Sequence, residues 1–268
     1  METILSSFLH DPTSALKTQI FIPRFIHRLR MAEAWGISSG ERILDTGCGQ
    51  GGSSLILAHL VGPNGRITGI DPVQPEYGTP FAVQQSQEYT KRSTLGSSLT
   101  FLRTDAPSFV HGLDCPASEV FDAAVLCHSL WYFQNRLTVY HLFRALRDAD
   151  IPCVYLWLDQ ESTLKAVQLA GFLLKKHGSI TPESTILEGH YEVQYVAEEK
   201  FTRVVREEGL PETQQDEILA WVTRVRKSNE ELKLAGLGER RYNTVNFGNE
   251  LPDTQLALSF PIPLPPGK

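Results

Sequence analysis

Short apolar runs alternate with segments of helical periodicity along the first 176 residues. The runs predict five strands, and the segments beside them predict helices. The strands are expected near 42–45, 66–71, 99–103, 121–126 and 151–157. The helices are expected near 14–35, 53–61, 81–94, 130–148 and 160–176. This alternation is typical of an α/β fold with a doubly wound, mostly parallel sheet.

The N-terminal residues carry a weaker pattern. Residues 1–13 are expected to be loosely ordered, and Pro23 should kink or split the helix at 14–35. One face of this helix is basic, and it either faces solvent or covers part of a ligand cleft near the substrate entrance. The residues of that face are Arg24, His27, Arg28 and Arg30.

The C-terminal third departs from a minimal α/β fold. Its best helix is expected at 211–235, where apolar side chains recur three and four residues apart. Two last strands are expected near 242–247 and 254–259, which would bring the sheet to seven strands. The expected parts are N-terminal cap helices, an α/β core, a helical lid or insertion, and the last strands with a proline-rich tail. They are placed at 1–35, 36–177, 178–240 and 241–268.

The stretch from Arg42 to Gly52 is the most informative in the chain. An apolar strand leads into Asp45, and an apolar helix follows the glycines. Those glycines are Gly47, Gly49, Gly51 and Gly52. Because glycine lacks a Cβ atom and tolerates positive φ, such a turn lets a ligand approach bare backbone. Backbone N–H groups at the helix start also offer an anion site.

Two classes of ligand fit this turn, and a structural turn without a ligand is the third possibility. Residues 47–52 satisfy the G-x-G-x-x-G pattern of dinucleotide-binding folds. Asp45 favours a different ligand, because a carboxylate there would repel a pyrophosphate and suit an ammonium group. S-adenosylmethionine (SAM) carries an α-amino group, a sulfonium and a ribose, but no phosphate.

Chemically distinctive residues also follow the other predicted strands. Asp71 ends the second strand, where an acidic residue takes the ribose hydroxyls in both ligand classes. Asp105 follows the third strand, and it either contacts the ligand or caps the next turn. The fourth strand opens into Cys-His-Ser-Leu-Trp-Tyr-Phe at 127–133. Since ligands of doubly wound sheets bind beyond the C-terminal ends of the strands, these positions predict one site.

Four phrases of the sequence resemble class I SAM-dependent methyltransferases, in particular the small-molecule methyltransferases of fungal secondary metabolism. The phrases are residues 30–37, 40–52, 69–72 and 127–133. The resemblance covers residues 30–160 and becomes unspecific from about Ser179. It implies a Rossmann-like, seven-stranded fold, SAM as the cofactor with S-adenosylhomocysteine (SAH) as the product, and a substrate lid in the C-terminal region.

The resemblance also implies roles for individual residues. The residues expected to bind SAM are Asp45, Gly47, Cys48, Gly49, Gly51, Asp71, Pro72, Asp105, Ala106 and Cys127. Asp105 and Ala106 would hold the adenine ring. Cys127 would offer its backbone carbonyl near the methionyl part of SAM.

His128 is the candidate catalytic residue. A histidine with an ordinary pKa of about 6.5 suits proton removal from a hydroxyl or ammonium acceptor at neutral pH. His128 could instead contact SAM or substrate without moving a proton, or have a structural role. Trp131 and Tyr132 either face the sulfonium or an aromatic substrate, or pack as core aromatics. The expected acceptor is an oxygen or nitrogen atom of a small apolar or heterocyclic metabolite.

Composition narrows the choice of partners. The chain of 268 residues is 41% hydrophobic and 21% charged, which is ordinary for a soluble globular protein. Its net charge of −6 gives no reason to expect nucleic acid or a membrane as a partner. The four cysteines form no C-x-x-C pair and the histidines show no ligand spacing, so we expect no metal and a cytoplasmic protein. The expected state is a monomer or homodimer with a small-molecule substrate.

Three other functions remain open at this point. The chain could bind SAM and catalyse a cyclisation or rearrangement without methyl transfer. It could be an NAD(P) oxidoreductase, which the glycine pattern alone allows. It could also be a non-catalytic SAM-binding partner of another methyltransferase subunit, since its C-terminal helices are rich in charge.

Overall fold

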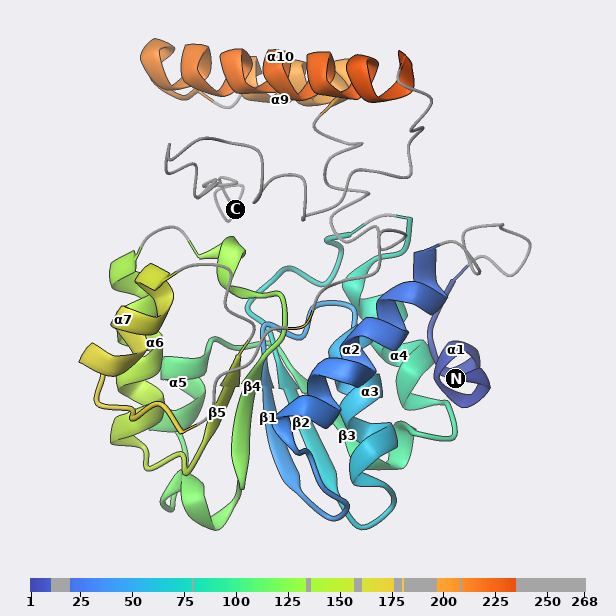
Figure 1. Ribbon diagram of the computed structural model, residues 1–268, viewed down its shortest axis with the longest axis vertical. Helices are drawn as coiled ribbons and strands as arrows, with labels where there is room; N and C mark the ends of the chain where they lie inside the picture. The colour runs from blue at the N-terminus through green and yellow to red at the C-terminus, as the bar shows by residue number, and fades with distance from the viewer. Residues whose placement is uncertain are drawn as a thin grey trace. The chain divides into compact units, whose positions relative to one another are not determined.

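The computed structural model describes residues 1–10, 20–78, 80–133, 136–156, 161–175, 180, 197–207 and 209–234 (Figure 1). These residues fall into two compact units. One is an α/β unit that ends near residue 180, and the other contains two helices from the C-terminal third.

A five-stranded parallel sheet forms the centre of the α/β unit, in the order β3-β2-β1-β4-β5. The strands are β1 (Arg42–Thr46), β2 (Arg66–Ile70), β3 (Leu99–Leu102), β4 (Ala123–Leu126) and β5 (Val154–Leu156). The predicted doubly wound α/β fold is therefore confirmed, with β1 and β4 as buried inner strands. Seven strands are not observed, because the strands predicted at 242–247 and 254–259 lie outside the described residues.

Helices cover both faces of this sheet (Figure 1). One face carries α2 (Ile22–Trp35), α3 (Gly52–Val61) and α4 (Val83–Lys91), with α1 (Glu2–Ser7) beside α3. The other face carries α5 (Ala106–His111), α6 (Arg136–Asp148) and α7 (Glu161–Leu169). The core between the sheet and α5–α7 is entirely apolar at its centre, where Phe143 and Leu126 are fully buried. This packing fixes the strand ends on which the site is built.

Two predictions about local structure need correction, and a third is only partly tested. Residues 2–7 form helix α1 rather than a loose segment, because Ile4 and Leu5 are buried in the core. Pro23 occupies the first turn of α2, where a missing N–H costs nothing, and residues 14–19, where the longer helix is expected to begin, lie outside the described ranges. The helix predicted at 130–148 is interrupted, since a 3-10 turn at Leu130–Tyr132 precedes α6.

A side-chain pair joins the start of β1 to the start of β4. The guanidinium of Arg42 donates to both carboxylate oxygens of Asp122, at 2.8 and 3.2 Å, and the Arg42 N–H also donates to Asp122 at 2.8 Å. These hydrogen bonds lower the pKa of Asp122 below its ordinary value. Both side chains remain about two-fifths exposed, so the pair is only partly shielded from water.

We expect Asp122→Asn to lower the free energy of unfolding at neutral pH by about 0.5–1 kcal/mol, as for a well-aligned exposed pair. Because the pKa of Asp122 is lowered on folding, the pair stabilises the fold above the ordinary Asp pKa of about 3.9 and is lost as pH falls through the folded value. Urea unfolding of both proteins at several pH values measures this. If the two proteins still differed in free energy of unfolding at the lowest pH, the difference would not come from the ionised Asp122 carboxylate.

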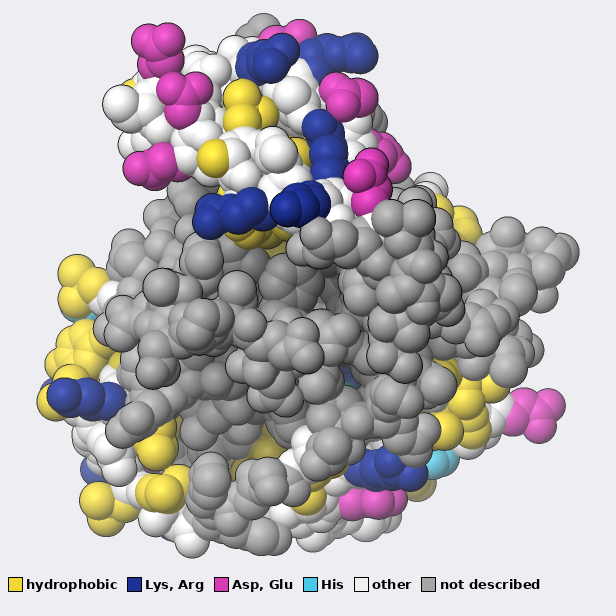
Figure 2. Space-filling model, turned by 45° about the horizontal axis from the view of Figure 1, so that its top comes forward, with side chains coloured by type: hydrophobic (Ala, Val, Ile, Leu, Met, Phe, Trp, Pro, Cys, Tyr) yellow, Lys and Arg dark blue, Asp and Glu magenta, His cyan; other side chains and the backbone are white. Residues whose placement is uncertain are grey.

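The second unit contains α9 (Glu199–Glu207) and α10 (Glu212–Leu234), which pack against each other. Val205, Val222 and Val225 are buried, and Arg226 donates hydrogen bonds to the carbonyls of residues 197 and 198 at 2.8 and 2.9 Å. Figure 2 shows charged side chains of both signs interspersed over the visible side of this unit. The helix predicted at 211–235 is confirmed, while its role as a lid stays a prediction.

No helix in the described ranges combines the length and the apolar character that crossing a bilayer requires.

Candidate active site

The parallel register brings the predicted positions to one edge of the sheet. Thr46 of β1 pairs with Ile70 of β2, and Ile70 pairs with Leu102 of β3. Leu126 ends β4 on the other side of β1. Asp71, Asp105 and Cys127 follow these strand ends closely, while Asp45 is the second-last residue of β1 itself. The site is therefore assembled where the carboxyl ends of four parallel strands meet.

The glycine turn after β1 requires glycine for steric reasons. Gly47, Gly49 and Gly51 all have positive φ, at 74°, 50° and 89°. A Cβ atom on Gly47 would lie 2.5 Å from the Cβ of Ser129, and one on Gly51 would lie 2.9 Å from the ring of Phe101. At Gly47 and Gly51 the backbone is thus packed against the segment after β4 and against β3, which leaves no room for a side chain, whereas a Cβ atom on Gly49 would meet nothing within 4 Å.

Four N–H groups of this turn donate to acceptors within the protein. Gly47 and Cys48 both donate to the carbonyl of Ile70, at 2.8 and 3.2 Å, and Gly51 donates to Cys48 at 2.9 Å. Gly49 donates to a carboxylate oxygen of Asp71 at 2.9 Å. A phosphate cradle needs such N–H groups to point at the ligand. The observed turn therefore lacks the donors that a pyrophosphate would need at these positions.

Gln87 of α4 is a functional position that the sequence analysis missed. Its side-chain amide donates to the carbonyl of Gly49 at 2.7 Å, so Gly49 is held on one side by Gln87 and on the other by Asp71. Asp71 also accepts from the N–H of Val73 at 3.0 Å. No local pattern marks Gln87, because its partner lies 38 residues earlier in the chain.

Asp45 is completely buried at the end of β1. One carboxylate oxygen accepts hydrogen bonds from the hydroxyls of Ser53 and Ser54, at 2.7 and 2.6 Å, while Oδ1 accepts none from any described residue. Burial raises the pKa of Asp45 above its ordinary value, and the two serine hydrogen bonds and the charge of Arg28 oppose that rise. A buried oxygen without a donor is costly, so this site suits a ligand that supplies one.

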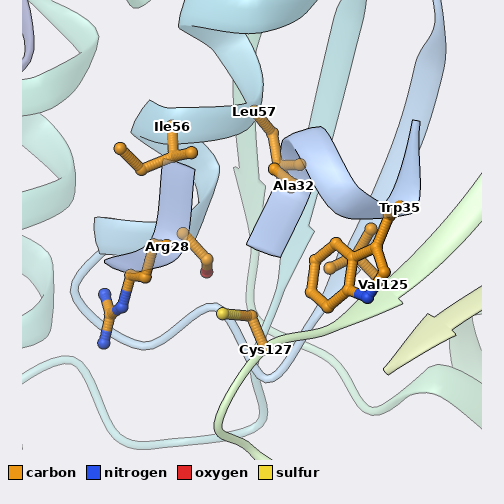
Figure 3. A pocket seen from close by; sticks show the side chains of 8 residues that line it. Arg28, Ala32, Trp35, Ile56, Leu57, Val125 and Cys127 are labelled. Carbon is orange, nitrogen blue, oxygen red and sulfur yellow. The ribbon is translucent and has the colours of Figure 1, made fainter. Parts of the chain in front are cut away.

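The basic face of α2 is divided between two environments. His27 is 3% exposed, and Arg28 lines a small cavity together with Ser53 and Cys127 (Figure 3). Arg30, in contrast, is exposed. Arg30 is therefore on the solvated side of this helix, whereas His27 and Arg28 are not, and a role of α2 in covering a ligand cleft stays a prediction.

His128 has an unusual backbone conformation. Its φ of 56° is in the left-handed region, where residues other than glycine are uncommon. Both ring nitrogens are buried, and the ring centroid lies 5.9 Å from that of His27. The next residue, Ser129, donates to the carbonyl of Thr46 at 3.0 Å and anchors the segment on β1. Such strain persists where surrounding contacts impose it, which is common at functional sites.

The remaining predicted residues differ in their contacts and in their exposure to solvent. Asp105 caps α5, accepting from the N–H and the hydroxyl of Ser108 at 2.8 and 2.9 Å, so the capping alternative is observed. Its neighbour Ala106 is buried, while Pro72 is exposed just after Asp71. Tyr132 is 52% exposed in the 3-10 turn, so it is not a core aromatic. The side chain of Trp131 lies outside the described part of the chain.

Comparison with known proteins points to one enzyme class. A family model described as a methyltransferase domain matches residues 37–147, which include β1 to β4 and the glycine turn. Methyltransferase phomM of Diaporthe leptostromiformis is 28% identical, with 90% of this chain and 86% of that protein covered. A sterol 24-C-methyltransferase of Eremothecium gossypii is 25% identical over 51% of this chain and 33% of its own length.

One solved structure is similar over most of its length. It is a cyclopropane-fatty-acyl-phospholipid synthase-like protein from Lactobacillus casei, with a TM-score of 0.66 and 25% sequence identity. The similarity covers 84% of this chain and 92% of that protein.

Proposed function

Because this chain is a class I SAM-dependent methyltransferase, we propose that it transfers the methyl group of SAM to an oxygen or nitrogen atom of a small secondary metabolite. The buried Asp45 carries this proposal, since its Oδ1 has no donor among the described residues and Asp45 immediately precedes a turn in which Gly47 and Gly51 leave no room for a Cβ atom. When bound, SAM would supply an electrophilic methyl group on a positively charged sulfonium, whose sulfur leaves as a neutral thioether.

The residues around the turn fit the other parts of SAM. Asp45 would accept from the α-ammonium group. Asp71 already holds Gly49, and each of its oxygens has capacity for a further hydrogen bond, here to the ribose hydroxyls. Asp105 and Ala106, which follow β3, would hold the adenine ring. Cys127 would offer its carbonyl to the methionyl part. Together these groups would favour a ligand that is a positively charged nucleoside without a phosphate group.

His128 is proposed as the general base. Its ring is buried at the same strand edge, and its strained backbone fixes its direction. A hydroxyl or ammonium acceptor must lose a proton as the methyl group arrives, and histidine performs this at neutral pH. Exposed Tyr132, three residues beyond the anchored Ser129, would contact the sulfonium or an aromatic substrate. Positioning of the acceptor in line with the methyl group supplies much of the remaining rate.

Carbon is the second candidate for the acceptor atom. It is favoured by the names of two similar proteins, the sterol 24-C-methyltransferase and the cyclopropane-fatty-acyl-phospholipid synthase-like protein. In that case His128 would remove a proton after methyl transfer instead of during it.

A turnover assay tests the proposal. The purified full chain is incubated with methyl-labelled SAM and a fungal metabolite extract, and SAH and labelled products are followed by mass spectrometry. We expect SAH to form in step with a product that has gained one methyl group. The product's NMR spectrum then assigns the methyl group to oxygen, nitrogen or carbon. A rearranged, unmethylated product that forms without conversion of SAM to SAH would contradict methyl transfer.

A further inference from the structure

His27 is a buried titratable residue that the proposed mechanism leaves unused. Four residues of α2 are buried, and three of them are apolar, namely Phe25, Met31 and Ala32. His27 is the fourth, and it is 3% exposed. Burying an imidazole costs more free energy than burying an apolar side chain, unless its nitrogens meet polar groups. Packing alone therefore gives no reason for a histidine at this position.

The ring of His27 lies against the ring of His128. The two centroids are 5.9 Å apart and the ring planes are inclined by 46°, which is within the range of aromatic contact. Their neighbours in the chain agree with this placement, since Arg28 and Cys127 line the same small cavity (Figure 3). The pair therefore joins α2 to the segment after β4 that carries the candidate base.

His128 needs a polar neighbour if it is to gain a proton. Both of its ring nitrogens are buried, so a positive imidazolium would form in a place shielded from water. A buried charge is costly unless polar groups face it. A neutral imidazole has one ring nitrogen with a free lone pair, which can stabilise a nearby positive charge. The ring of His27 supplies such a group at the position where the charge would form.

We propose that His27 is a positioning residue for His128, and that its polar ring orients the base and stabilises its protonated form. The proposal rests on the proposed function, since it extends the assignment of His128 as general base. As the acceptor gains the methyl group, its proton passes to a ring nitrogen of His128 and from there to solvent. The pair therefore neither gains nor loses a proton over one turnover. His27 contacts neither SAM nor the acceptor in this assignment.

Two substitutions at His27 separate the polarity of the ring from its bulk. His27→Phe keeps a flat ring without nitrogens, and His27→Gln keeps polar atoms in a different shape. With the acceptor identified by the turnover assay, we expect His27→Phe to lower kcat about 10- to 100-fold. The KM of the acceptor and the affinity for SAH should stay within about threefold of the wild type. His27→Gln should be faster than His27→Phe, whereas a purely structural role predicts the reverse order, because phenylalanine fills the buried space better.

A double variant tests whether His27 acts through His128. His128→Asn alone removes the proposed base, so the addition of His27→Phe should lower kcat no further, within about twofold. Titration with SAH counts the active sites, which corrects each rate for the fraction of folded protein. Two effects that multiply would overturn the proposal, since His27 would then act independently of His128.

Met31→Leu is the matched control. Met31 is fully buried one turn further along α2, and leucine in its place alters the packing of the helix without removing a titratable group. This variant should keep kcat within about twofold of the wild type. Full activity of His27→Phe, or a His27→Gln enzyme no faster than His27→Phe, would also overturn the proposal. A wild-type protein that forms no methylated product would instead contradict the proposed function.

Discussion

Replacing Gly47 with alanine should abolish measurable SAH binding and lower the free energy of unfolding by about 2–5 kcal/mol. Two costs add at this position. The φ of 74° is strained for any residue with a Cβ atom, and that atom would lie 2.5 Å from the Cβ of Ser129. Ser129 cannot yield easily, because its hydroxyl is bonded to Thr46. Relief of the clash therefore displaces the turn from the segment after β4, and with it the ligand site.

Gly40→Ala is the matched control for this prediction. Gly40 has a φ of 87°, but nothing lies within 4 Å of the position of its added Cβ atom. It should therefore show only backbone strain, about 1–2 kcal/mol, with SAH affinity unchanged. Urea unfolding and calorimetry of both variants provide the comparison. If Gly47→Ala lost no more stability than Gly40→Ala and bound SAH normally, the contact of Gly47 with Ser129 would not be important for the turn.

Replacing His128 with asparagine should lower kcat for methyl transfer about 10²- to 10⁴-fold, the usual contribution of a general base. Asparagine is chosen because it tolerates the left-handed backbone that His128 adopts, so the segment should keep its conformation. SAH affinity should change little, because the proposed contacts of the cofactor come from other residues. Single-turnover rates with the acceptor found in the extract measure the effect.

His59→Asn, on the exposed surface of α3, serves as the control and should keep the wild-type rate. A His128→Asn enzyme with full activity would remove the base assignment and leave methyl transfer itself standing. A loss of SAH binding in step with the loss of rate would instead assign His128 to cofactor contact.

The strand ends could be predicted from sequence because each signal is local. An apolar run followed by Asp45, by Asp71 or by Cys127 marks a strand and its C-terminal residue in one short stretch. Parallel pairing then follows from the alternation of strands with helices. The five-stranded order confirmed this reasoning, and the predicted strand bounds differ from the observed ones by only a few residues.

Features that depend on tertiary contacts could not be predicted in this way. The break before α6 is one, since the apolar periodicity continues through it while Ser129 ties the preceding segment to Thr46. The contact of Gln87 with Gly49 is another, and so is the order of α1, which is stabilised by burial of Ile4 against the core. The sequence shows Ser53 and Ser54, but it does not show that their hydroxyls point at the carboxylate of Asp45.

Those hydroxyls refine the account of Asp45. Two serines share one carboxylate oxygen, so the ligand's ammonium is assigned to the other oxygen, Oδ1. An ammonium favours the ionised carboxylate, whereas burial raises the pKa of Asp45 in the ligand-free protein. Binding should therefore release a proton at low pH, and affinity should rise as pH rises through the Asp45 pKa.

Calorimetric titration of wild type and Asp45→Asn with SAH across a range of pH measures whether Asp45 binds the ammonium group of the ligand. We predict that the wild type binds SAH with a Kd between about 1 μM and 1 mM, and that affinity declines as the pH is lowered. Asp45→Asn should bind about tenfold or more weakly, without that dependence on pH. Absence of SAH binding by the wild type at millimolar concentration would contradict a SAM site in this protein. Equal binding by Asp45→Asn at every pH would contradict the contact between Asp45 and the ammonium group.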